Sequence, residues 1–150
     1  MNLAIVRKSL AALLVPVCAA SAGLALAHTQ NGSLGDFAGA TDYYQISCSD
    51  DGNGVPASIA VQVMNRSPAS PSLSVLVHRA LSAVSGTDAL AGDEVSSPLM
   101  FNNNGDGVYN VFVTKAAAGA ENYTLTFHCL TGPDGTGEHT GTTLVFRQNQ

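Results

Sequence analysis

Four histidines are the side chains in this sequence best suited to metal chemistry: His28, His78, His128 and His139. Cleavage of the chain after Ala27 would make His28 the first residue, so that its α-amine and its ring Nδ1 could bind one metal ion together. Amine and imidazole nitrogens suit Cu(II), which heads the divalent affinity series. A second imidazole, from one of the other three histidines, would complete a copper site. The alternative interpretation is that these histidines are ordinary solvated surface residues and bind no metal.

Two turns carry the oxygen ligands that calcium prefers. Their candidate ligands are Asp50 and Asp51 in the first turn, and Asn102, Asn104 and Asp106 in the second. The second turn alternates its oxygen side chains before Gly107, as the start of an EF-hand loop does, but its twelfth position is Val113 instead of a bidentate glutamate. Asn and Asp also form turns without any metal, because they tolerate left-handed backbone. The sequence favours the turn interpretation over calcium binding.

The motifs of common enzyme classes are missing from the sequence. Neither a G-x-S-x-G elbow nor an S-x-x-K motif is present. Asp93 and Glu94 are a pair of carboxylates, but adjacent residues in an extended segment point to opposite sides, which does not suit glycoside hydrolysis. A copper monooxygenase starting at His28 would need a larger core and a flat aromatic surface, and the chain has no tryptophan. We therefore expect a protein that is not an enzyme.

The first 27 residues have the pattern of a cleaved signal peptide. A basic start at Arg7 and Lys8 precedes an apolar centre over residues 10–20, and Ala25 and Ala27 form a small-residue cleavage site. The apolar stretch nearly reaches the length of a membrane-spanning helix, so an uncleaved anchor is the alternative. We expect a mature chain of residues 28–150 that is secreted or periplasmic, in a bacterium, and not held in a membrane.

The charge of the expected mature chain argues against nucleic acids and anionic membranes as partners. Removal of the leader leaves four basic and eleven acidic residues, a net charge of −7. The four basic residues are dispersed: Arg66, Arg79, Lys115 and Arg147. Nucleic acids and anionic membranes need clustered Lys and Arg side chains, so neither is expected as a partner.

The mature chain keeps two of the three cysteines, Cys48 and Cys129, because Cys18 lies in the leader. Both lie on the apolar side of an alternating segment: Cys48 follows Tyr44 and Ile46, whereas Cys129 follows Leu125 and Phe127 among others. They are far apart in sequence and do not form a C-x-x-C motif, so a redox role is disfavoured. We expect a structural disulfide in an oxidising compartment.

Short alternating segments separated by turn residues predict an all-β fold, a single β-sandwich domain over residues 28–150. Residues 105–115 and 119–129 are expected to form an antiparallel hairpin across a short Ala/Gly connection, whereas residues 80–98 have weak patterning and are expected to be a loop or a short helical turn. The remaining expected strands are residues 34–37, 43–48, 59–64, 73–79, 99–102 and 142–147.

Four of these segments resemble, in order and spacing, the bacterial pre-peptidase C-terminal domain family. The match covers roughly residues 36–129 and rests on Asp42-Tyr-Tyr-x-Ile, a Leu-x-Val-x-Val strand, Gly-Asp-Gly-Val-Tyr-x-Val-x-Val and Gly-Ala-x-Asn-Tyr-Thr-Leu-Thr-Phe. The resemblance implies a jelly-roll-like sandwich with an accessory role, such as surface attachment, secretion support or matrix binding, and no catalysis. Two features depart from the pattern: we expect no peptidase beside this domain, and residues 131–150 form an additional segment.

We therefore expect a secreted, non-catalytic module that acts in binding, surface attachment or extracellular assembly. Its expected partner is an extracellular protein or polysaccharide, bound through the loops at residues 50–54, 80–98 and 131–140. Self-association is the assembly version, in which an exposed edge strand at residues 142–147 pairs with a neighbouring copy. Copper binding through His28 is the alternative function.

Overall fold

A computed structural model describes residues 28–68 and 71–150, and every regular element in these ranges is a β-strand. The strands are β1 (His28–Leu34), β2 (Thr41–Ser49), β3 (Ser58–Asn65), β4 (Leu73–Arg79), β5 (Ser82–Asp88), β6 (Met100–Asn102), β7 (Gly107–Lys115), β8 (Glu121–Leu130) and β9 (His139–Gln148). The predicted all-β class is confirmed. Over these residues the chain forms no helix that is long and apolar enough to span a membrane. The predicted signal peptide lies outside the described residues.

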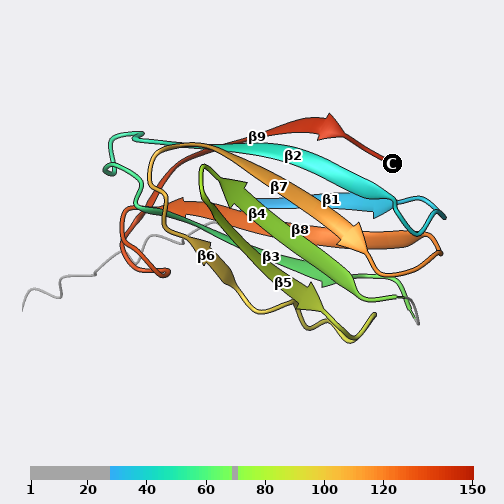
Figure 1. The fold of residues 1–150 in the computed structure, drawn as a ribbon. Helices are drawn as coiled ribbons and strands as arrows, with labels where there is room; N and C mark the ends of the chain where they lie inside the picture. Colours follow the sequence, from blue (N-terminus) through green and yellow to red (C-terminus); the bar gives the residue numbers. More distant parts are fainter. Residues whose placement is uncertain (1–27, 69–70) are drawn as a thin grey trace, which may run out of the picture.

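The strands form two facing layers, which β9 joins into an almost closed sheet (Figure 1). The β2 layer has the order β5-β4-β7-β2-β9, and the β8 layer consists of β1, β8, β3 and β6. β9 pairs with β8 only at its first two residues and then runs along β2 in the other layer. All pairings are antiparallel.

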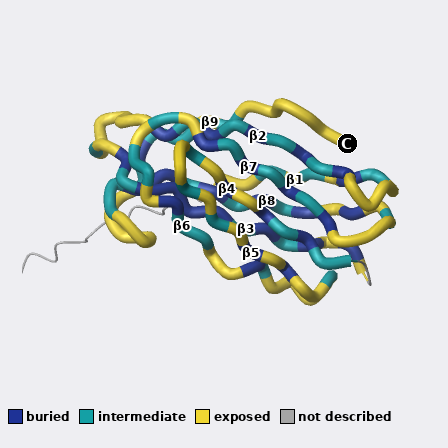
Figure 2. Tube along the Cα trace, in the orientation of Figure 1, coloured by how far each residue is buried: buried dark blue, intermediate teal, exposed yellow. Residues whose placement is uncertain are grey.

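The core lies between the two layers and follows the alternation of the strands. β2, β7 and β8 bury every second residue, as the alternating dark and pale segments of these strands in Figure 2 show. Many of the inward residues are β-branched or aromatic, the types that pack best on a pleated surface. The largest fully buried aromatic side chains are Tyr44, Tyr109 and Tyr123.

Cys48 and Cys129 form a disulfide, as the sequence predicted. Their Cα atoms are 5.6 Å apart, which is within the usual range for a bridge. Both cysteines lie near the ends of their strands, and their side chains point inward and are buried. Since β2 and β8 belong to different layers, the bridge connects the layers covalently at one end of the molecule.

The predicted hairpin between residues 105–115 and 119–129 is wrong, although both segments are strands. β7 pairs with β2 and β4, whereas β8 pairs with β1, β3 and β9, so the short connection crosses from one layer to the other. The physical reason is burial. Each strand has one mostly apolar face, and placing the strands in opposite layers lets these faces pack against each other across the core.

Two further expectations about strands also need correction. The first strand covers His28–Leu34, not residues 34–37, and Ser82–Asp88 is a strand within the segment expected to be a loop or helical turn. Both strands are at sheet edges and are rich in polar residues, so the apolar alternation that marks the inner strands is weak in them. The remaining predicted strands are present, with bounds shifted by at most a few residues.

Candidate functional site

Two rows of side chains cross the outer face of the β2 layer in register. The first row places Tyr43 of β2 opposite Phe112 of β7, which is in turn opposite Leu76 of β4. The second row, two residues along each strand, places Gln45 opposite Asn110, followed by His78 on β4. We call these six residues the amide–aromatic face. All six are at least partly exposed to solvent.

Hydrogen bonds join the two rows and hold their polar groups in place. The Tyr43 hydroxyl donates to Asn110 Oδ1 at 2.7 Å, and Gln45 Nε2 donates to the Tyr43 hydroxyl at 2.9 Å. Arg147 lies at the rim of the face, and its Nε donates to Gln45 Oε1 at a distance of 2.8 Å. The rings of Tyr43 and Phe112 are stacked, with centroids 4.8 Å apart and an interplanar angle of 12°. These contacts hold the side chains of Tyr43, Gln45, Asn110 and Phe112 in place without a ligand.

The amide–aromatic face carries hydrogen-bonding groups but no carboxylate and no ammonium group. The side chains that alternate outward on β2, β7, β4 and β5 include no Asp, Glu, Lys or Arg. The carboxylates of Asp42 and Asp88 belong to buried residues on the inner side of these strands. A face of amides, hydroxyls and aromatic rings therefore stands out on a chain with eleven acidic residues.

The structure brings His128 and His139 together at the disulfide end of the β8 layer. Their ring centroids are 4.5 Å apart, and the ring planes differ by 16°. His139 is opposite Leu130, two residues along β8 from His128, so both imidazoles lie on the same side of the layer. The Nδ1 atom of His128 is buried and has no hydrogen-bond partner among the described residues.

His28 begins β1 beside this pair, whereas His78 is elsewhere. His28 is opposite Phe127, and the two rings are stacked with centroids 5.8 Å apart. His78 lies on the outer face of the other layer, opposite Ala83. The copper site predicted from four histidines thus reduces to three that lie near one another. The described residues include no group of three His, Cys, Asp or Glu side chains arranged to hold a metal ion.

Burial lowers the pKa of His128 from 6.5 to about 4. The neighbouring imidazoles of His139 and His28 lower it further, since a second positive charge nearby would be unfavourable. The His128 ring is therefore neutral at physiological pH, which means that only one of its two nitrogens carries a proton.

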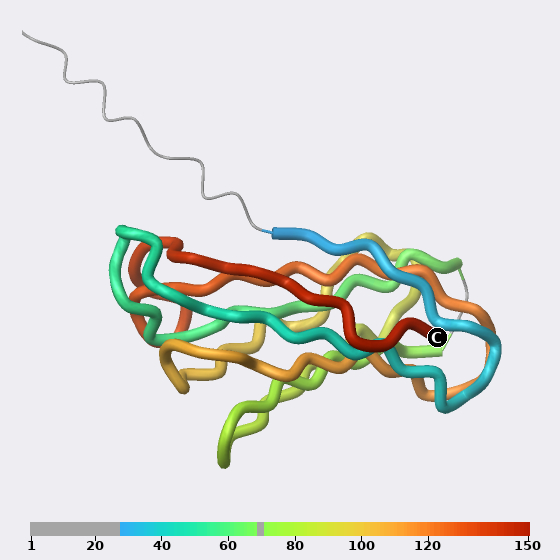
Figure 3. The backbone as a smooth tube through the Cα atoms, turned by 90° about the horizontal axis from the view of Figure 1, so that it is seen from above, coloured from blue at the N-terminus to red at the C-terminus, as the bar shows by residue number. Residues whose placement is uncertain are grey.

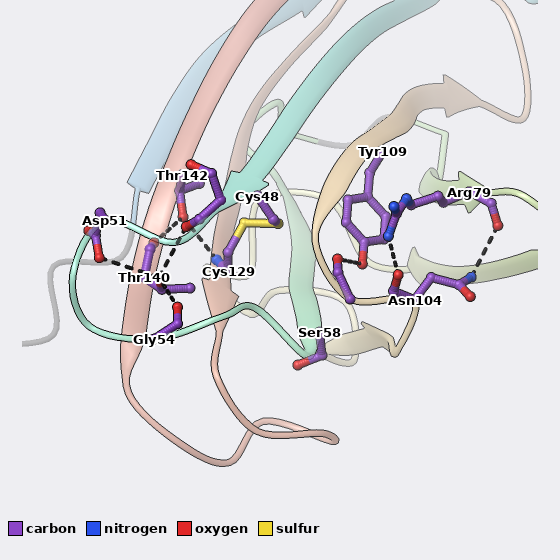
Figure 4. Close-up of a disulfide and its surroundings, with 12 residues drawn as sticks. Cys48, Asp51, Gly54, Ser58, Arg79, Asn104, Tyr109, Cys129, Thr140 and Thr142 are labelled. Atoms are coloured by element: carbon purple, nitrogen blue, oxygen red, sulfur yellow. Dashed lines mark hydrogen bonds between the residues drawn. A yellow bond between two sulfur atoms is a disulfide. The ribbon is translucent and has the colours of Figure 1, made fainter.

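Asp50 and Asp51, proposed as calcium ligands, hold the turn that follows β2. Asp50 Oδ1 accepts hydrogen bonds from the backbone N–H groups of Gly52 and Gly54, at 2.8 and 3.1 Å. Asp51 Oδ1 accepts from Asn53 N at 3.2 Å and from the hydroxyl of Thr140 at 3.3 Å. Figure 4 shows Thr140 between Asp51 and Gly54, next to the disulfide. These carboxylates act as turn acceptors in the structure.

The second proposed calcium turn is tied to the β4–β5 hairpin. The Asn104 side chain donates to the backbone oxygen of Arg79 at 3.1 Å and to Asn102 Oδ1 at 3.0 Å. Arg79 donates in return to the backbone oxygen of Asn104, and its guanidinium lies 5.2 Å from the centre of the Tyr109 ring (Figure 4). Asp106 is exposed. The positive charge of the Arg79 guanidinium among these oxygens disfavours the binding of a cation at the same place.

The amide–aromatic face was not predicted from the sequence. Tyr43, Gln45, Asn110 and Phe112 were readable as the outward positions of two strands, opposite to the inward set. Their positions relative to one another could not be predicted, because they require β2 and β7 to be neighbours in one layer.

The segment at residues 80–98, expected to be a loop that binds a partner, instead contains β5, and Figure 3 shows the turn between β4 and β5 projecting from the body. Leu81 in this turn is fully exposed.

Comparison with known proteins shows no significant similarity: no family model matches this chain, and neither do the curated proteins or the solved structures compared with it.

Proposed function

We propose that this chain is an exported, non-catalytic binding module that holds a neutral polysaccharide on its amide–aromatic face. The observation that carries the proposal is the ordered pair of rows across β2, β7 and β4, with the Tyr43–Phe112 stack at its centre. Sugars present apolar C–H faces and many hydroxyl groups, and a surface that combines aromatic rings with oriented amides satisfies both.

Charge favours a neutral ligand for this face. An acidic polysaccharide would require several Lys or Arg side chains, and a basic peptide would require carboxylates, but neither type projects from the outer sides of β2, β7, β4 and β5. Arg147 of β9, at the rim, supplies a single guanidinium, which donates to Gln45. Five strands about 4.8 Å apart give the layer a width of roughly 19 Å, enough for a short oligosaccharide to cross several strands.

Export and the accessory role are part of the same proposal. A disulfide that connects the two layers is consistent with an oxidising compartment, secreted or periplasmic. The two-layer β-fold is compatible with a jelly-roll-like sandwich of the kind implied by the resemblance to the pre-peptidase C-terminal domain family. A rigid, disulfide-linked scaffold with binding groups on one face suits a module that attaches to a surface.

The test is a binding measurement with purified mature protein and insoluble cellulose, chitin and mixed-linkage β-glucan, followed by titration with the matching oligosaccharide. Tyr43→Ala and Phe112→Ala should each weaken binding by at least about tenfold, as the loss of a central aromatic contact does. Thr126→Ala, on the outer side of the β8 layer, is the matched control and should bind as the wild type does. Absence of binding to every neutral polysaccharide, or equal loss in the control, would refute the proposal.

A second candidate, self-association, has one observation in its favour. Beyond its first two residues, β9 pairs only with β2 among the described strands, so its other edge is open from Gly141 to Gln148. A copy of the chain could add a strand to this edge. Light scattering at rising protein concentration should then show growing oligomers, and a constant monomer mass would exclude this candidate.

A further inference from the structure

β8 has one edge that two strands share, and His128 is at the point where they meet. β1 pairs with this edge from Glu121 to Phe127, and β9 pairs with it at Cys129 and Leu130. The other edge of β8 is occupied by β3. The first residue of β1, His28, is therefore opposite the residue before His128, and the first residue of β9, His139, begins just beyond it.

The topology thus gathers three nitrogen donors from three strands that are far apart in sequence. His128 and His139 supply imidazoles on the same side of the layer, with ring centroids 4.5 Å apart. The His28 side chain is directed to Phe127 on the opposite side, so the nitrogen that His28 can offer here is its α-amine, at the end of the strand. That amine exists only after cleavage behind Ala27, the position that the sequence predicts.

The Nδ1 atom of His128 is a second and independent sign of a ligand. A buried polar atom without a partner costs free energy, and native proteins leave few of them. This Nδ1 has no hydrogen-bond partner among the described residues, even though hydroxyl and amide side chains are abundant in the chain. A metal ion bound at the His128 ring, with the ring turned to direct either nitrogen at it, would supply the missing partner.

We propose that mature protein beginning at His28 binds one divalent transition-metal ion, best represented by Cu(II), through the imidazoles of His128 and His139 and the α-amine of His28. Neutral nitrogen donors suit Cu(II) among the divalent ions. Two nitrogens bound at about 2 Å to one ion are about 3 Å apart, so the stacked imidazoles must turn in order to bind. His139 can turn because it is the first residue of its strand and follows the loop at residues 131–138.

This site is independent of the proposed polysaccharide face. The amide–aromatic face belongs to the outer side of the β2 layer, whereas the three nitrogens lie on the β8 layer. His78 belongs to the former and makes no contribution to the metal site, so it provides a matched control for the removal of one imidazole.

The experiment titrates Cu(II) into exported, metal-free protein whose first residue has been confirmed as His28 by mass spectrometry, in the presence of glycine as a competing chelator. His128→Ala and His139→Ala should each weaken binding by at least about tenfold, and His78→Ala should leave it unchanged. Electron paramagnetic resonance of the copper-loaded wild type should show hyperfine coupling to three nitrogens.

The amine is tested with two further variants of the same protein. Gly-Ser placed ahead of His28 moves the α-amine away and should weaken binding as much as the loss of an imidazole, whereas His28→Ala keeps the amine and should retain most of the affinity. Equal affinity in the wild type, His128→Ala and His139→Ala would mean an adventitious ion only and would overturn the proposal. Full affinity in the extended variant, or loss in His78→Ala, would overturn it as well.

Discussion

The hydroxyl oxygens of Tyr44 in β2 and Tyr123 in β8 lie 2.5 Å apart in the interior, so hydrogen bonding connects the two layers away from the disulfide. Tyr123 also donates to the buried carboxylate of Asp42, which accepts a further hydrogen bond from Gln150 N at 2.9 Å. Burial raises the pKa of Tyr44 to about 12, and burial together with these hydrogen bonds raises that of Tyr123 as well. Both hydroxyls therefore remain protonated and can donate at physiological pH.

Tyr123→Phe should lower the free energy of unfolding by about 1–3 kcal/mol, because the buried Asp42 carboxylate loses a donor that no solvent can replace. Urea unfolding followed by circular dichroism measures the change. Tyr43→Phe removes a hydroxyl from a partly exposed hydrogen bond and is the control, with a smaller expected effect. Equal stability of Tyr123→Phe and the wild type would show that the buried network contributes nothing.

Gly32→Ala should destabilise the protein by about 1–3 kcal/mol through overpacking. A Cβ atom at Gly32 would lie 2.3 Å from both Cζ and Oη of Tyr123, the ring that reaches across the core to β2. Gly39→Ala is the matched control, because a Cβ atom at Gly39 would meet nothing within 4 Å. Thermal unfolding of the two variants should separate them clearly, and similar melting temperatures would contradict the close approach of β1 to Tyr123.

Replacing both Cys48 and Cys129 with Ala should cost about 4.5 kcal/mol, since the bridge closes a loop with a sequence separation of 81 residues and so restricts the unfolded chain. Unfolding in denaturant with and without a reducing agent checks this value in the wild type. The double variant should have the stability of the reduced wild type, whether or not the reducing agent is present. A thiol assay that finds two free cysteines in native, exported protein would rule out this contribution.

Stability should fall as the pH is lowered from about 6.5 to 4. His128 has a pKa of about 4 in the folded protein against 6.5 without the fold, so over this range the unfolded chain binds more protons and gains free energy relative to the folded one. Allowing for solvent screening of a half-buried ring, the loss is on the order of 1 kcal/mol at pH 5.

The measurement compares urea unfolding at pH 7 and pH 5 in the wild type and in His128→Gln, which has no group to protonate. The variant should lose less stability than the wild type between these two pH values. His78→Gln removes a histidine from the other layer and should follow the wild type. A pH dependence that is identical in wild type and His128→Gln would contradict the role of His128.

Local alternation was enough to predict the inner strands and the direction of their side chains. Tyr44, Ile46 and Cys48 lie inward on β2, and Leu125 and Cys129 lie inward on β8, as expected from a period of two. The disulfide followed from the same reasoning, because Cys48 and Cys129 both lie on the apolar faces of alternating segments. These properties depend on residues close in sequence, which is why they could be predicted.

The pairing of strands was decided by the tertiary structure alone. Neighbours in sequence, β7 and β8, separate into opposite layers because their apolar faces are buried best against each other, and β9 crosses between the layers to bring His139 beside His128. The edge strands β1 and β5 form by hydrogen bonding to their neighbours in spite of polar sequences. Contacts between distant segments set these features, and such contacts leave no periodic trace in the sequence; only packing of the whole chain selects them.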